Sequence, residues 1–227
     1  EKMKYSVSIN EITTIVSKAL FAIGLPPGVD SENGKNIAWL EAHGLEGVSI
    51  LLEEIKDLEI LERWPDPSIT ALKECLIIHS LNPSGLLLAQ TVIDFAETGK
   101  TILIKKCKAP LIIFAEAARR AKNTGSFEIT WGVNNTIFKG ICNKNFAAIN
   151  KVPKISRQPI DVTVKAGSKR TSVNMLFLEK MYDTSLRHGI RLDKCLWSEL
   201  VDVAKGSLVP TNIHSRASAG AEVDDSH

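Results

Sequence analysis

The chain of 227 residues is 44% apolar and 24% charged, which is ordinary usage for a globular protein. That length allows one large domain or two small ones, with a core that needs neither disulfides nor metal. A formal net charge of +2 lies too close to neutrality to indicate a nucleic-acid-binding protein, so we expect no nucleic acid among its partners.

Three helices are predicted in the first sixty residues. The first begins at Ser8, where Glu11 follows three residues later as in a capping box. A second helix is expected to be capped at residues 30–31, and a third to cover about residues 45–61, because apolar residues recur there at helical spacing. We therefore predict a helical cap over residues 1–64.

The prolines at positions 65 and 67 interrupt this pattern, since proline cannot continue a helix interior. The following residues alternate between helical and β-type patterns and predict an α/β core over residues 65–208. The predicted helices cover 86–95, 110–122, 172–187 and 193–204, and the predicted strands cover 101–104, 127–131, 136–141 and 160–164. The run of strand, helix and strand from residue 101 to 131 predicts a parallel crossover. We expect an α/β fold, with α+β as the alternative: a mixed sheet flanked by helices behind the helical cap.

The four cysteines, Cys75, Cys107, Cys142 and Cys195, follow no metal-binding or redox spacing. We interpret them as free, inert thiols in a reducing compartment. No apolar run approaches the roughly eighteen residues of a membrane helix, and the N-terminus lacks the apolar segment of a signal peptide. These features predict a cytoplasmic protein with no membrane partner.

Nucleotide-binding and nucleophile motifs are missing from the sequence: it contains no GxGxxG, no P-loop and no GxSxG. The nearest approach to an anion site is the basic stretch that ends in Lys169 and Arg170, just before a predicted helix. A phosphate or carboxylate would suit these two side chains. The alternative is a solvated basic loop.

The five histidines are scattered and none pairs at a metal-binding spacing, so we expect no metal site. The sequence names no cofactor. His43 lies before Gly44 at the end of the second predicted helix, and this layout resembles the N-terminal helices of the non-Rossmann malate/L-lactate dehydrogenases. In that family a Ser-His-Gly sequence contributes to the active site. Here Ala42 replaces the serine and the chain is shorter, so we interpret His43 as a cation at a helix C-terminus.

The C-terminal tail, residues 209–227, combines residue types that suit recognition. Ser215 and Arg216 offer a hydroxyl and a planar cation for a carboxylate. Gly220 lies in a run of small residues that allows close backbone approach, and Asp224 and Asp225 follow as acids. Composition alone favours a polar, frayed end.

Two stretches resemble a known family. Gly24-Leu25-Pro26-Pro27-Gly28, followed by Trp39-Leu40, resembles the opening of a bacterial domain-of-unknown-function family, the one numbered three-seven-two-six. The Val-Pro, Ser-Arg, small-residue and acidic segments of the tail resemble its ending. Pro27 stands where the family usually has tryptophan. The resemblance implies a patterned tail but no reaction.

Together these features favour a small-molecule enzyme, or an enzyme-like subunit, acting on a carboxylate-bearing metabolite. Asp224 and Asp225 would be catalytic, and Arg216, Ser215, Gly220, Lys169 and Arg170 would bind a small carboxylate or phosphate ligand. The alternative is a non-catalytic accessory subunit whose tail folds onto a neighbouring chain and locks the interface. In either case we expect a homo-oligomer.

Overall fold

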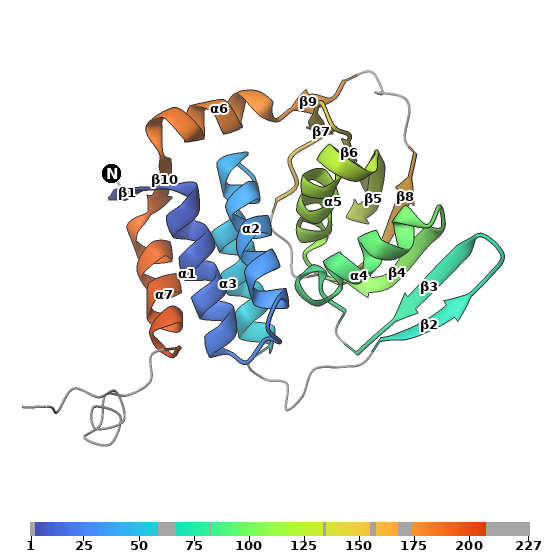
Figure 1. Ribbon diagram of the computed structural model, residues 1–227, viewed down its shortest axis with the longest axis horizontal. Helices are drawn as coiled ribbons and strands as arrows, with labels where there is room; N and C mark the ends of the chain where they lie inside the picture. Colours follow the sequence, from blue (N-terminus) through green and yellow to red (C-terminus); the bar gives the residue numbers. More distant parts are fainter. Residues whose placement is uncertain are drawn as a thin grey trace, which may run out of the picture.

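The computed structural model describes residues 3–58, 67–81, 83–133, 135–154, 158–167 and 174–207. The described chain forms a layer of helices beside an eight-stranded mixed sheet, and two further helices lie between the layer and the sheet (Figure 1). This confirms the predicted α/β class. No helix in these ranges has the length and apolar content needed to cross a bilayer.

The helical layer is built from helices whose ends follow local sequence signals. Ser8 and Glu11 form the predicted capping box: the Glu11 N–H donates to the Ser8 hydroxyl over 3.1 Å, and the Ser8 N–H donates to the Glu11 carboxylate over 2.7 Å. The second helix begins earlier than predicted, because Gly28 takes the N-cap position with a φ of 95°. The layer contains α1 (Ile9–Ala22), α2 (Val29–Ala42), α3 (Gly47–Leu58) and α7 (Lys194–Lys205).

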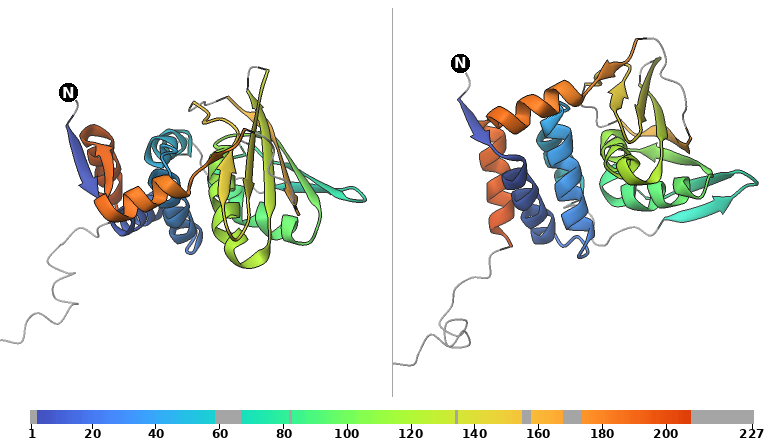
Figure 2. Two further views of the ribbon diagram at one scale, coloured as in Figure 1. Left: turned by 90° about the horizontal axis from the view of Figure 1, so that it is seen from above. Right: turned by 45° about the horizontal axis from the view of Figure 1, so that its top comes forward.

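The last described elements return to the N-terminal helices. Strand β10 (Ile190–Asp193) pairs antiparallel with β1 (Lys4–Val7), and α7 packs along α1 (Figure 2). Asp193 caps α7 by accepting a hydrogen bond from the Cys195 N–H over 2.8 Å, which confirms the predicted helix start. The division of the chain into a cap at 1–64 and a core at 65–208 remains a prediction.

The sheet has the strand order β2-β3-β4-β8-β5-β6-β7-β9. Only β3 and β4 are parallel neighbours among the described strands. Strands β4 and β5 are both antiparallel to β8, so they run parallel to each other with β8 between them. The strands are β2 (Ser68–Ala71), β3 (Cys75–His79), β4 (Thr101–Cys107), β5 (Phe127–Val133), β6 (Thr136–Cys142), β7 (Ala147–Ile149), β8 (Ile160–Ala166) and β9 (Leu176–Phe177).

The predicted helix over 172–187 is wrong in its first part. Leu176 and Phe177 form β9 and pair with Ile149 and Ala148 of β7. The helix α6 (Glu179–His188) begins only after that edge strand, and residues 172–173 lie outside the described ranges. From there α6 runs from the sheet edge to the helical layer (Figure 1).

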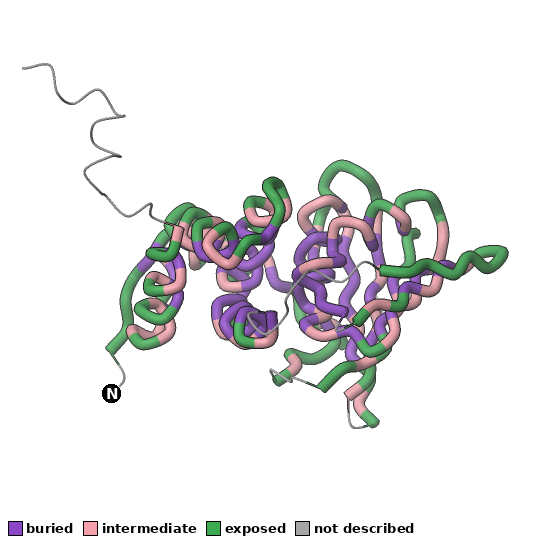
Figure 3. The backbone as a smooth tube through the Cα atoms, turned by 90° about the horizontal axis from the view of Figure 1, so that it is seen from below, coloured by how far each residue is buried: buried purple, intermediate pink, exposed green. Residues whose placement is uncertain are grey.

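Two helices, α4 (Gly85–Glu97) and α5 (Pro110–Thr124), pack against each other and against the sheet. Pro110 opens α5 as predicted. Helix α2 packs against α1 on one side and α5 on the other, so it is buried nearly all round (Figure 3). A buried polar network links α2 to α5: Arg119 donates to the Asn36 side chain over 2.7 Å, and Asn36 donates to the Glu116 carboxylate over 2.9 Å.

Candidate functional site

None of the site residues predicted from the sequence lies in a described range. Lys169 and Arg170 fall in residues 168–173, and Ser215, Arg216, Gly220, Asp224 and Asp225 fall in residues 208–227. The structure therefore does not place them, and their roles remain predictions. The described residues bring together two other groups of side chains, one near each end of α5.

His43 is the C-cap of α2 and is only 7% exposed. Gly44 follows it with a φ of 72°, a left-handed conformation that suits glycine and turns the chain out of the helix. The imidazole ring stacks on Trp39 at a centroid distance of 3.9 Å and on Tyr182 of α6 at 4.9 Å. Ser185 holds α6 against the end of α2 by donating to the Ala42 carbonyl over 2.8 Å.

The protonation of His43 follows from these contacts. Its Nδ1 lies 2.6 Å from the Trp39 carbonyl oxygen, which can only accept, so Nδ1 carries the proton and Nε2 has the lone pair. Burial lowers the pKa of His43 to about 4, with a smaller contribution from the positive charge of Lys122. His43 is therefore a neutral base at pH 7. The predicted place of His43 at the end of the second helix is confirmed, while burial disfavours the cationic form expected there.

The His43 pocket opens beside this stack. It lies between the end of α2, the C-terminal half of α5, the turn between β6 and β7, and α6, and encloses about 570 Å³ including its open mouth. Lys122 and Lys144 bring two positive charges, while Glu179 accepts a hydrogen bond from the Ala147 N–H over 2.5 Å. The lining residues are Trp39, His43, Ala118, Lys122, Asn143, Lys144, Asn145, Phe146, Ala147, Glu179 and Tyr182.

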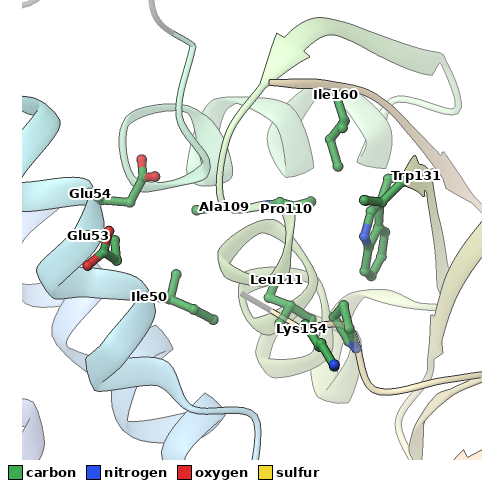
Figure 4. A pocket seen from close by; sticks show the side chains of 11 residues that line it. Ile50, Glu53, Glu54, Ala109, Pro110, Leu111, Trp131, Lys154 and Ile160 are labelled. Atoms are coloured by element: carbon green, nitrogen blue, oxygen red, sulfur yellow. The ribbon is translucent and has the colours of Figure 1, made fainter. Parts of the chain in front are cut away.

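The Glu54 pocket lies at the other end of α5, where α3 faces the sheet (Figure 4). It encloses about 500 Å³ including its mouth, and most of its lining is apolar. Ala109 precedes α5 with a φ of 48° and, with Pro110, forms part of the wall. The lining residues are Ile50, Glu53, Glu54, Ala109, Pro110, Leu111, Trp131, Val133, Pro153, Lys154 and Ile160.

Glu54 is the buried acid of this pocket and is 6% exposed. Its Oε2 accepts a short hydrogen bond from the hydroxyl of Ser84, the N-cap residue of α4. Burial raises the pKa of Glu54, while the Ser84 hydrogen bond and the charge of Lys108 act in the opposite direction. Lys108 itself pairs with Asp57 over 2.8 Å. Glu54 is thus a buried carboxyl group whose pKa lies above the ordinary value.

The sequence contains features of Glu54 and His43 that could have identified them as site residues. Glu54 follows Leu51 by three positions and precedes Leu58 by four, so it lies on the apolar stripe of α3. A glutamate in such a stripe requires a partner. The sequence around His43 resembles a dehydrogenase site. No local pattern indicated that Tyr182 would stack on His43 from a distant segment.

Three of the four cysteines lie on strands of the sheet, on β3, β4 and β6. Cys107 and Cys142 are fully buried; burial raises the pKa of both thiols, that of Cys142 to about 12. This agrees with inert thiols at these two positions, whereas Cys75 is half-buried and Cys195 is exposed, so burial does not account for inert thiols there. In the described ranges, no group of three or more histidine, cysteine, aspartate or glutamate side chains is arranged to hold a metal ion.

The family comparison bears on the N-terminal third of the chain. Residues 7–84 match the model of a family described as "Protein of unknown function (DUF3726)". This confirms the resemblance inferred from the opening of the sequence, and the matched residues include both His43 and Glu54. A comparison with curated proteins gave no match.

Solved structures share the fold. The malate dehydrogenase of Pyrococcus horikoshii OT3 is 10% identical with a TM-score of 0.65, over 92% of this chain and 97% of that one. The sulfolactate dehydrogenase of Methanocaldococcus jannaschii is 9% identical with a TM-score of 0.63, over 89% and 97%. A dehydrogenase of Sinorhizobium meliloti is 10% identical with a TM-score of 0.66, over 89% and 100%. At this identity the likeness establishes the fold and nothing finer.

Proposed function

We propose that this chain is an enzyme-type protein whose His43 pocket binds a small carboxylate-bearing metabolite, with His43 as the group that accepts or donates a proton. The observation that carries the proposal is a neutral imidazole, fixed between Trp39 and Tyr182, that lines a pocket together with Lys122 and Lys144. A base and an anion-binding surface thus occur in one cavity.

Each group has a separate task in this proposal. The ammonium groups of Lys122 and Lys144 would donate charge-assisted hydrogen bonds to a carboxylate. Nε2 of His43 would exchange a proton with a hydroxyl or carbonyl oxygen on the neighbouring carbon. Two structural neighbours are a malate dehydrogenase and a sulfolactate dehydrogenase. Malate and sulfolactate both carry a hydroxyl beside a carboxylate, so this chemistry supports the choice of ligand class.

Binding is tested with malate as the probe, by calorimetry and thermal shift. We expect Lys122→Met and Lys144→Met each to weaken malate binding about tenfold, because each removes a charge-assisted hydrogen bond. Lys18→Met makes the same change on the exposed side of α1, where it lines neither pocket, and should leave affinity unchanged. Equal affinity in all four proteins, or no binding of malate and related hydroxy acids, would refute the carboxylate site.

The role of His43 is tested by counting protons. A bound carboxylate raises the pKa of a nearby imidazole, so binding near pH 5 should take up protons. The other charged groups of the pocket are Lys122, Lys144 and Glu179. Calorimetry in two buffers of different ionisation enthalpy measures the net uptake, to which the carboxyl groups of malate contribute equally in both proteins, and His43→Gln should lower it while malate still binds. Undiminished uptake in that variant would contradict the role of His43.

The tail residues Arg216, Asp224 and Asp225 remain a further part of this proposal.

A second candidate function, an accessory subunit, is favoured by the apolar side chains Leu176 and Phe177, which are 51% and 50% exposed at the edge of the sheet. Truncation after Pro210 separates the two. Loss of malate binding without a change in oligomeric state favours the enzyme type, and a change in oligomeric state with unchanged binding favours the accessory subunit.

A further inference from the structure

The Glu54 pocket has two unlike walls. On the sheet side, Leu111, Trp131 and Ile160 present apolar surface (Figure 4). On the opposite side, α3 supplies the carboxylates of Glu53 and Glu54. A pocket of this kind, apolar with a few polar groups on one side, is the usual form of a small-molecule site.

The carboxyl group of Glu54 has unused acceptor capacity. Oε2 accepts from the Ser84 hydroxyl, but no described residue donates to Oε1. In the described ranges, Asn33 Oδ1 is the one fully enclosed side-chain nitrogen or oxygen without a hydrogen bond. Oε1 of Glu54 is therefore not fully enclosed, and as part of the pocket lining it can meet a donor from a ligand.

The charges around the pocket favour a positive donor. Two acids, Glu53 and Glu54, line it against one lysine, Lys154, and Glu53 pairs with Lys56 over 3.6 Å. The next lysine in the neighbourhood, Lys108, is already paired with Asp57 over 2.8 Å. A cation that donates to Oε1 would complete the hydrogen bonding of Glu54 and favour its ionised form, whereas an anion would face this acid.

We propose that the Glu54 pocket is a second ligand site, which binds an aromatic or similarly apolar molecule carrying an amine or amidine group. The positive group donates to Oε1 of Glu54, and the apolar body lies against Leu111 and Trp131. The site goes beyond the carboxylate function proposed above. Pro110 and Lys122 mark the two ends of α5, about 18 Å apart at the rise of an α-helix, so the two pockets bind separately.

Benzamidine is the probe, with benzoate and benzyl alcohol as matched aromatic molecules of negative and zero charge. Calorimetry should give an affinity for benzamidine at least tenfold above that for either of the others, because only benzamidine offers charged N–H donors to Glu54. Equal or tighter binding of benzoate would overturn the proposal.

The variant Glu54→Gln keeps the shape of the side chain and its acceptor for Ser84, but removes the charge. We expect it to weaken benzamidine binding about tenfold and to leave benzyl alcohol within about twofold. Glu97→Gln is the matched control, since Glu97 pairs with Arg120 over 2.6 Å and does not line the pocket. Unchanged benzamidine affinity in Glu54→Gln would refute the role of Glu54.

A second variant tests the same pocket independently, in case Glu54→Gln does not fold. Val133→Phe narrows the pocket from the sheet side, where Val133 is half-buried, without touching Glu54. It should weaken benzamidine and benzyl alcohol together. Full binding of both would show that the probes lie elsewhere and would overturn the site. Malate binding at the His43 pocket should persist in these variants, which distinguishes failure of this proposal from failure of the first.

Discussion

The two ends of α5 place a titratable group in similar surroundings but with opposite results. At the C-terminal end, burial keeps His43 neutral as a base, beside Lys122 and Lys144. At the N-terminal end, burial raises the pKa of Glu54, beside Glu53. Desolvation always disfavours the charged form, so the same physical effect lowers the pKa of the imidazole at one end and raises the pKa of the carboxyl group at the other.

The comparison also shows how each group is held. His43 is fixed by rings from α2 and α6 and by a backbone carbonyl. Glu54 is fixed by one hydroxyl, which also caps α4. The base therefore depends on stacking between distant segments, whereas the acid depends on a single hydrogen bond. Three measurements separate these modes.

The largest effect is expected on the free energy of unfolding when the pH is lowered and His43 becomes protonated. Its folded pKa of about 4 lies below the ordinary 6.5, so the unfolded chain binds the proton first as pH falls. The stabilisation is complete above pH 6.5 and is lost toward pH 4, by about 3 kcal/mol. Urea unfolding of the wild type and His43→Gln between pH 7.5 and 4 measures it as a difference.

That difference is needed because Glu41, Glu54 and Glu116 act in the opposite direction. Burial raises the pKa of each, so the folded chain binds their protons first and acid stabilises it through them. Both proteins contain these glutamates, and the subtraction removes them. Parallel pH profiles of the two proteins would show that His43 is not held in the neutral form.

A smaller effect is expected at the Glu54 end from Ser84→Ala. This change removes the cap from α4, whose Leu86 N–H donates to Ser84 over 3.1 Å, and takes the donor from Glu54. We expect the free energy of unfolding to fall by about 2 kcal/mol. Ser8→Ala removes an exposed cap of the same type from α1 and should cost about 1 kcal/mol. Equal losses would mean that the Glu54 hydrogen bond adds no net stability.

The smallest effect is expected from Tyr182→Leu, which removes one ring of the stack. Stability should fall by about 1 kcal/mol. The pKa of His43, followed by NMR titration, should rise toward 6.5 because water gains access to the ring. Tyr182→Phe keeps the ring and is the control. A His43 pKa that stays near 4 in Tyr182→Leu would show that Trp39 and the helix alone shield the imidazole.

The sequence predicted those structural features that depend on residues close together in the chain. The capping box at Ser8 and the helix start at Asp193 were predicted correctly, and in each the capping side chain and its target lie within three residues. Strand β1 was missed because its partner, β10, lies almost the whole described chain away. Leu176 and Phe177 follow a helical pattern, but pairing with β7 overrides it.

The candidate site divides in the same way. Glu54 was recoverable from its position in the apolar stripe of α3, although its partner Ser84 was not. The His43 pocket needs Tyr182, Lys122 and Lys144 from three separate segments, and a single sequence does not show which distant side chains meet. Buried titratable groups in amphipathic helices are therefore the part of such a site that sequence reasoning can reach.

Because β1 pairs with β10, the helical layer can close only late in the synthesis of the chain. Among the described helices, α1 is made first and α7, which packs along it, is made last. At a translation rate of about 5–20 residues per second, roughly 10–40 seconds separate the two on the ribosome. During that time the sheet can form while one side of α1 stays uncovered. The helical layer of the nascent chain therefore closes only after the sheet beside it is complete.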